Sequence, residues 1–156
     1  MPPRHRVLII GALFVLSAGA AIGADLTGAA AAKDRIAHMK AMGGAAKALG
    51  DQLRSGAPDP AVVKTEAAKI DASAKALPTW FPAGSGPSSG AETHALPLIW
   101  SDPTGFAAKQ HALALAAAKL DATASAGDMA AVGPAMQAVG GACKGCHETY
   151  KAKEKT

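Results

Sequence analysis

The sequence predicts an all-α domain, an antiparallel four-helix bundle of up-down-up-down topology with a long loop between helices 2 and 3. Two observations favour this fold. Apolar residues recur at alternating spacings of three and four, which is the pattern of helices packed in a bundle. All but one of the predicted connections between helices are short, as in bundles whose neighbouring helices are antiparallel. No competing segment shows the alternating pattern of a strand.

The first helix is predicted over about residues 28–53. Its apolar stripe consists of Ile36, Met39, Ala46 and Leu53, with Met42 and Leu49 beside it. A pair of glycines, Gly43-Gly44, interrupts this stripe. Such a pair indicates either a bend in the helix or the close approach of another group.

The second helix has clear signals at both ends. Asp59 can cap it, Pro60 suits its first position, and Pro78 ends it. Its predicted seam consists of Val63, Ala67, Ile70, Ala74 and Leu77.

Residues 78–100 resist a regular assignment and are predicted to form a long, ordered loop. A loop of this length in a bundle is usually functional or disordered. Its apolar side chains argue against disorder and for packing onto the bundle; they are Trp80, Phe81, Leu96, Leu98, Ile99 and Trp100.

The third helix is predicted to be capped by Ser101 or Asp102 and to begin at Pro103. Its seam consists of Phe106, Gln110, Leu113, Ala117, Leu120 and Ala124. The fourth helix is predicted from Asp128 or Pro134 to about Lys153, with a kink or a restart at Pro134. Its stripe consists of Val132, Met136, Val139, Cys143, Cys146 and Tyr150.

The beginning of the chain predicts export. Arg4 and Arg6 precede an apolar run over residues 7–16, and small residues follow. This is typical of a signal peptide, here residues 1–23, cleaved between residues 20 and 24. An uncleaved anchor is the alternative, but the run is shorter than the roughly 20 residues that span a bilayer. We therefore expect one periplasmic domain, residues 24–156, without stable membrane insertion.

The composition leaves room for a cofactor and excludes one class of partner. Aromatic residues make up only 4% of the chain, so an alanine-rich bundle would bury little area per residue. A large cofactor would fill such an interior. The loss of Arg4 and Arg6 on cleavage leaves a small positive charge, without the basic excess of a nucleic-acid-binding protein.

The two cysteines of the chain lie in one short motif, Cys143-Lys144-Gly145-Cys146-His147. This is the signature of covalent haem attachment. Cysteines three positions apart lie on the same side of a helix, so both can reach the vinyl groups on one edge of a porphyrin. The next residue can then bind the iron through its imidazole. We predict one haem c per chain, attached to Cys143 and Cys146, with His147 as axial ligand.

Three other interpretations of the motif are weaker. A redox-active dithiol normally opens a helix that follows a strand, where the helix dipole lowers the thiol pKa. A zinc site would need a further ligand, and no nearby candidate is obvious. A structural disulfide would not need His147.

Met39 is the candidate sixth ligand of the iron, because the first and fourth helices are expected to be neighbours. Arg35, one turn earlier, is a candidate partner of a haem propionate. Trp100 and Phe81, from the long loop, are expected to close one side of the haem cavity. The alternatives are ordinary core packing for Met39 and a solvated charge for Arg35; Met42 is the rival methionine. The other conceivable ligands, which are more often surface residues, are His38, His94 and His111.

From about Lys33 to Lys153 the chain resembles the cytochrome c prime family, the class II c-type cytochromes. Four segments carry the resemblance: RIAHMKAMG from residue 35, LPTWFPAGSG from residue 77, ALPLIWSDP from residue 95 and VGGACKGCHETYK from residue 139. The family often has arginine after the tyrosine, where this chain has Lys151.

The resemblance implies a four-helix bundle around one haem, often dimerised through its first two helices. One branch of the family is five-coordinate and binds nitric oxide or carbon monoxide; the other has a first-helix methionine on the iron and carries electrons. We predict electron transfer with redox partner proteins in the periplasm, with gas sensing or detoxification as the alternative. An enzyme is not expected, because no acid–base pair is recognisable beside Met39.

Overall fold

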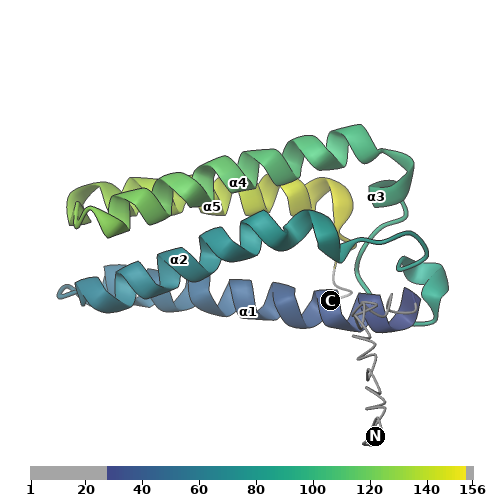
Figure 1. Ribbon diagram of the computed structural model, residues 1–156, viewed down its shortest axis with the longest axis horizontal. Helices are drawn as coiled ribbons and strands as arrows, with labels where there is room; N and C mark the ends of the chain where they lie inside the picture. The colour runs from purple at the N-terminus through teal and green to yellow at the C-terminus, as the bar shows by residue number, and fades with distance from the viewer. Residues whose placement is uncertain (1–27, 154–156) are drawn as a thin grey trace, which may run out of the picture.

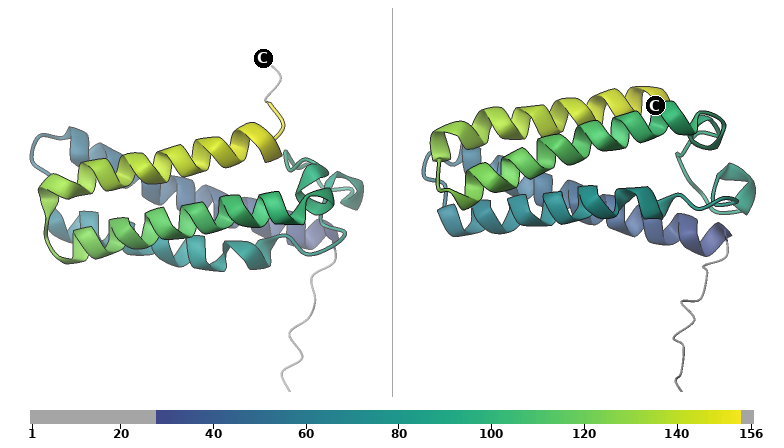
Figure 2. Two further views of the ribbon diagram at one scale, coloured as in Figure 1. Left: turned by 90° about the horizontal axis from the view of Figure 1, so that it is seen from above. Right: turned by 45° about the horizontal axis from the view of Figure 1, so that its top comes forward.

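A computed structural model describes residues 28–153 as an antiparallel four-helix bundle (Figure 1). Its long helices are α1 (Gly28–Arg54), α2 (Pro60–Ala76), α4 (Pro103–Ser125) and α5 (Met129–Tyr150). Helices α1 and α2 form one layer, and α4 and α5 form the other; Figure 2 shows the same arrangement from two further sides. The predicted fold is confirmed. The predicted signal peptide lies outside the described residues.

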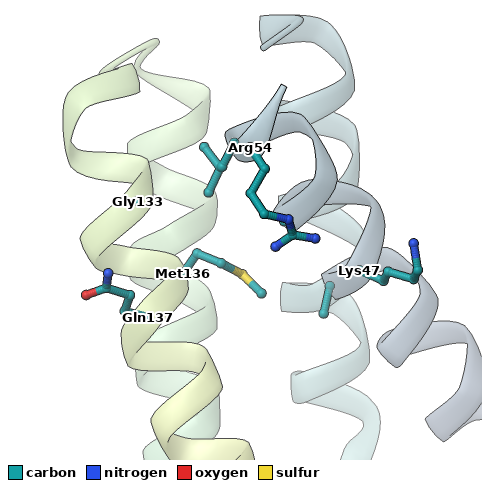
Figure 3. A pocket seen from close by; sticks show the side chains of 8 residues that line it. Lys47, Arg54, Gly133, Met136 and Gln137 are labelled. Carbon is teal, nitrogen blue, oxygen red and sulfur yellow. The ribbon is translucent and has the colours of Figure 1, made fainter. Parts of the chain in front are cut away.

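The helices pack in chain order, α1 on α2, α2 on α4 and α4 on α5. Helices α1 and α5 adjoin across a pocket instead, which Gly50 and Leu53 of α1 and Gly133 and Met136 of α5 help to line. Figure 3 shows the Met136 side chain reaching from α5 into this pocket. The first and last long helices are therefore neighbours, although they are not packed as closely as the other pairs.

The predicted seams largely match the buried core. All five seam residues of the second helix are buried, and in the third only Gln110 is half-buried. In α1 the predicted stripe lies beside the buried face: its residues Ile36, Met39, Ala46 and Leu53 are only half-buried, whereas Arg35 and Leu49 are buried. An apolar pattern could not anticipate a buried arginine, since its burial depends on partners in the long loop.

Aspartates cap three of the long helices. The Asp59 carboxylate accepts from the backbone N–H of Ala61 at 2.8 Å, Asp102 from Gly105 at 3.0 Å, and Asp128 from Ala131 at 3.2 Å. These bonds satisfy amide groups that have no partner inside the helix. Of the predicted alternatives, Asp102 rather than Ser101 and Asp128 rather than Pro134 therefore mark the helix starts.

Two features of the last helix differ from expectation. Helix α5 runs through Pro134 without the restart that was one of the two alternatives there, and it ends at Tyr150, short of the expected end near Lys153. Pro134 lies early in the helix and is exposed, so its missing N–H costs one bond on the solvent side.

The glycine pair of α1 has open space around it, because no group lies within 4 Å of the place where a Cβ on Gly43 or Gly44 would be. No other part of the described chain therefore approaches these glycines closely, and α1 runs unbroken through both.

The long loop contains three short helical turns, where the sequence indicated no regular structure. They are η1 (Leu77–Trp80), η2 (Pro87–Ser89) and α3 (Leu98–Ser101). As predicted, the loop packs onto the bundle, with Trp80 and Ile99 buried. It covers the end of the bundle at which α5 terminates (Figure 1). Within residues 28–153, no helix has both the length and the apolar character needed to cross a membrane.

Two leucines of α4 test the assignment of the core. Leu120 is 0% exposed and Leu115 is 60% exposed. We expect Leu120→Ala to lower the free energy of unfolding by about 2–5 kcal/mol, because it leaves a cavity among close-packed side chains. Leu115→Ala, the control on the same helix, should change it by less than about 0.5 kcal/mol. Urea unfolding followed by far-UV circular dichroism measures both, and equal effects would contradict the core described here.

Candidate haem site

The last turns of α5 present two half-buried thiols to two different clusters of side chains. Cys143 packs against the main core of the bundle. Cys146 packs against a smaller cluster at the loop end, formed by Ile99, Phe106 and Tyr150. Neither cysteine is in a disulfide. The motif therefore lies where the core meets the long loop.

Burial raises the pKa of both thiols, and for Cys146 the neighbouring Cys143 raises it further while Lys109 partly lowers it. Both are therefore protonated at neutral pH. A redox-active dithiol has a lowered pKa, so the environment argues against that interpretation. A thiol that adds across a vinyl group delivers both its sulfur and its proton, and protonated thiols suit this chemistry.

His147 is exposed at the surface of the same turn. Its pKa is lowered, first by desolvation of the ring and then by the charge of Lys151. The imidazole is thus neutral at pH 7, with a nitrogen lone pair free to bind a metal ion. Within the described part of the chain, no three His, Cys, Asp or Glu side chains are grouped to hold a metal ion. A single imidazole ligand suits haem iron.

Met39 and Arg35 contribute to the site from α1. Met39 is half-buried and packs against the same core cluster as Cys143. Its place on the apolar stripe is confirmed, and its position relative to His147 remains a prediction. Arg35, one turn earlier, is only 3% exposed, so the interpretation of Arg35 as a solvated charge is wrong.

The guanidinium of Arg35 binds the long loop through four hydrogen bonds. Its Nη1 donates to the carbonyl of Trp80 at 3.3 Å and to the hydroxyl of Ser85 at 2.9 Å. Its Nη2 donates to the carbonyl of Ser85 at 2.9 Å and to the hydroxyl of Thr93 at 3.2 Å. Nothing in the sequence pattern singled out Ser85 or Thr93, because a small polar residue in a loop is ordinarily solvated.

Two aromatic rings of the loop complete the surroundings of Arg35. Its guanidinium carbon lies 4.8 Å from the centre of the Phe81 ring and 5.7 Å from that of Trp100. Burial lowers the pKa of Arg35, and no carboxylate within residues 28–153 pairs with it. A buried cation without an acidic partner is costly in proteins. The structure thus brings three of the predicted site residues together around one uncompensated positive charge.

The other three histidines that the sequence offered as conceivable ligands lie at the surface. His38 is exposed, stacks on Trp80 with ring centres 4.8 Å apart and lies 3.1 Å from the carboxylate of Asp34. His94 and His111 are also exposed. The pocket between α1 and α5 shown in Figure 3 lies toward the other end of the bundle from Cys146 and His147, and we assign it no role.

A helical bundle whose last helix bears paired, protonated thiols followed by a neutral imidazole has the features of a c-type cytochrome. The family model for cytochrome c' matches residues 30–151. The chain therefore belongs to the cytochrome c' family, whose members carry a covalently attached haem c.

Individual relatives agree with this membership. Cytochrome c' of Rhodopseudomonas palustris is 36% identical over 150 residues, which are 96% of this chain and 97% of that protein. The crystal structure of Rubrivivax gelatinosus cytochrome c' matches with a TM-score of 0.74 at 32% identity, over 80% of this chain and 97% of that one. A ferrous variant of Alcaligenes xylosoxidans cytochrome c prime with bound NO matches with a TM-score of 0.75 at 29% identity, over 83% and 99%.

The role of Arg35 can be tested by a change that keeps its charge. Arg35→Lys cannot reproduce the planar fork that reaches Trp80, Ser85 and Thr93 together. We expect it to lower the free energy of unfolding by about 2–3 kcal/mol, since buried acceptors lose charged donors. Arg54→Lys on the same helix is the control, because that side chain is 70% exposed and pairs with Asp51 at the surface. Urea unfolding should show little change for the control; a similar loss in both variants would contradict the role of Arg35.

Proposed function

We propose that this chain is an exported monohaem cytochrome that transfers electrons in the periplasm. In this proposal haem c is attached to Cys143 and Cys146, and His147 is an axial ligand of its iron. The observation that carries the assignment is the placement of the motif: Cys143 and Cys146 lie three positions apart on one helix, each packed against an apolar cluster, and His147 follows directly. Export to the periplasm is proposed from the predicted signal peptide.

When bound, the haem supplies reversible one-electron chemistry, and the residues of the chain hold and tune it. Cys143 and Cys146 would hold one edge of the ring to α5, and His147 would supply an imidazole nitrogen to the iron. The apolar core beside Cys143 includes Val139 and Leu113. It would keep water away from the side of the haem that faces the bundle interior. The proposed role is that of a carrier and not of an enzyme.

Met39 is proposed as the sixth ligand, from the opposite side of the ring. Its contact with the cluster that also receives Cys143 supports this role. A thioether ligand favours the reduced iron and raises the reduction potential. Arg35 is proposed to bind a haem propionate, which would supply the anion that this buried guanidinium lacks. Phe81 and Trp100, which flank the guanidinium, would then line the same side of the cavity.

Binding of a diatomic gas is the second candidate function. It is favoured by the similarity to a solved cytochrome c prime with bound NO. In that case Met39 would crowd an open axial position without binding the iron, and its half-buried, apolar surroundings would suit a small uncharged ligand. The proposal also includes a homodimer formed through α1 and α2. It includes, in addition, an unidentified redox partner in the periplasm.

The attachment is tested by mass spectrometry of protein made with a haem-attachment system. The wild-type chain should carry the mass of one haem, and the variant with both Cys143→Ala and Cys146→Ala should carry none. Lys144→Ala is the matched control, because Lys144 lies between the cysteines but is exposed. A covalent haem in the double variant would refute the proposed attachment.

The choice between the two candidate functions is tested with carbon monoxide. If Met39 binds the iron, the ferrous wild type should resist carbon monoxide at concentrations that saturate Met39→Leu, because leucine keeps the volume and removes the sulfur. Met42→Leu, three residues on, should behave like the wild type. Absorption spectra give the bound fraction. Equally ready binding by the wild type and by Met39→Leu would exclude Met39 as a ligand and favour the gas-binding function.

A further inference from the structure

Helix α5, which is proposed to bear the haem, is tied to α4 by a partly buried hydrogen bond. Tyr150, the last residue of α5, is 4% exposed, and its hydroxyl donates to Oδ2 of Asp102 at 2.7 Å. It lies one turn after Cys146 and His147. Asp102 is the cap of α4, and its Oδ1 accepts from the N–H of Gly105 at 3.0 Å. One carboxylate thus joins the end of α5 to the beginning of α4.

The fit around this bond leaves no room for a side chain at position 105. A Cβ on Gly105 would collide with Oδ2 of Asp102 and with the hydroxyl of Tyr150. The Tyr150 ring also packs edge-on against Phe106, with ring centres 5.1 Å apart. The first turn of α4 is therefore shaped around the Tyr150 side chain.

The same end of α5 is held from the other side by the long loop. The N–H of Leu96 donates to the carbonyl of Tyr150 at 3.0 Å, and the N–H of Ala152 donates to that of His94 at 2.7 Å. Ala95 and Lys151 pair as an antiparallel bridge between these bonds. The last turn of α5 is thus fixed in position by both α4 and the loop.

The Tyr150–Asp102 bond is charge-assisted at neutral pH. The bond from Tyr150, followed by that from Gly105, holds the pKa of Asp102 below its ordinary value. The bond to Asp102 raises the pKa of Tyr150 to about 12. The phenol is therefore a neutral donor and the carboxylate an ionised acceptor, which is the stronger kind of hydrogen bond.

His147 lacks the support that a metal-binding histidine usually has. Such a ring is normally oriented by a hydrogen bond from its second nitrogen to a neighbouring acceptor. Within residues 28–153, no side-chain or backbone group forms such a bond with the His147 ring. The direction of the ring must then be set by the helical turn that carries it.

We propose that Tyr150 and Asp102 are positioning residues for His147, which fix the last turn of α5 and thereby the orientation of the axial imidazole. The proposal rests on the proposed function, in which His147 binds the iron. It assigns a role to a tyrosine and an aspartate that do not themselves ligate the iron. The bond acts through the backbone of one helical turn, from position 150 to position 147.

Tyr150→Phe tests this role in the haem-containing protein, because it keeps the ring against Phe106 and removes only the hydroxyl. We expect two changes. The ferric-to-ferrous ratio at a fixed potential should shift, because hydrogen bonding around an axial ligand is one of the levers on the reduction potential. The proton NMR shifts of the haem methyl groups in the ferric protein, which follow the orientation of the axial imidazole, should also change their pattern. Asp102→Asn, which keeps an acceptor oxygen but not its charge, should show smaller changes in both.

Asp128→Ala is the matched control, because it removes the cap at the opposite end of the same helix. It should weaken α5 without moving either haem signal. Unchanged signals in Tyr150→Phe, or the same changes in Asp128→Ala, would overturn the positioning role and leave the bond as a structural contact. A wild-type chain with the mass of the haem-free protein would instead refute the proposed function, before any of these variants is compared.

Discussion

The guanidinium of Arg35 holds the long loop onto α1, and the loop end of the bundle depends on this contact. Through Trp80, Ser85 and Thr93 it binds three points of a segment that has little regular structure of its own. A buried cation can remain there only because its hydrogen bonds are satisfied by fixed acceptors. With the loop in place, Phe81 reaches both the main core and the smaller cluster beside Cys146.

The haem-binding motif benefits from this arrangement. Cys143 faces the alanine-rich core, whereas Cys146 and Tyr150 face aromatic side chains from the loop and from α4. The large side chains that the composition made scarce are thus gathered at the end of the bundle where the motif lies. A cofactor attached there would meet rigid surroundings on one side and the shallow lysine-lined surface around His147 on the other.

Local patterns predicted the regular parts of this protein well. The seam from Val63 to Leu77 and the capping roles of Asp59 and Asp102 follow from spacing and residue type, which act within a few residues along the chain. The burial of Arg35 and the bond of Tyr150 to Asp102 could not be predicted in this way. The hydrogen bonds of Arg35 join residues that lie 45 to 58 positions apart in the sequence, and the bond of Tyr150 joins residues 48 positions apart. No periodicity along the chain indicates such partners. Pro134 did not mark the start of the last helix, because the cost of a proline depends on its place in the helix and on its exposure.

The bundle class, the seams of the second and third long helices and the attachment motif at Cys143, Cys146 and His147 could all be predicted from the residues alone. These features follow from local spacing, because a helix places residues three and four apart on one side. The tertiary structure alone decided which polar side chains are buried and what they bind. Hydrogen bonds and desolvation depend on groups that the fold brings together from distant segments. Asp102 at the beginning of α4 and Tyr150 at the end of α5 are such a pair.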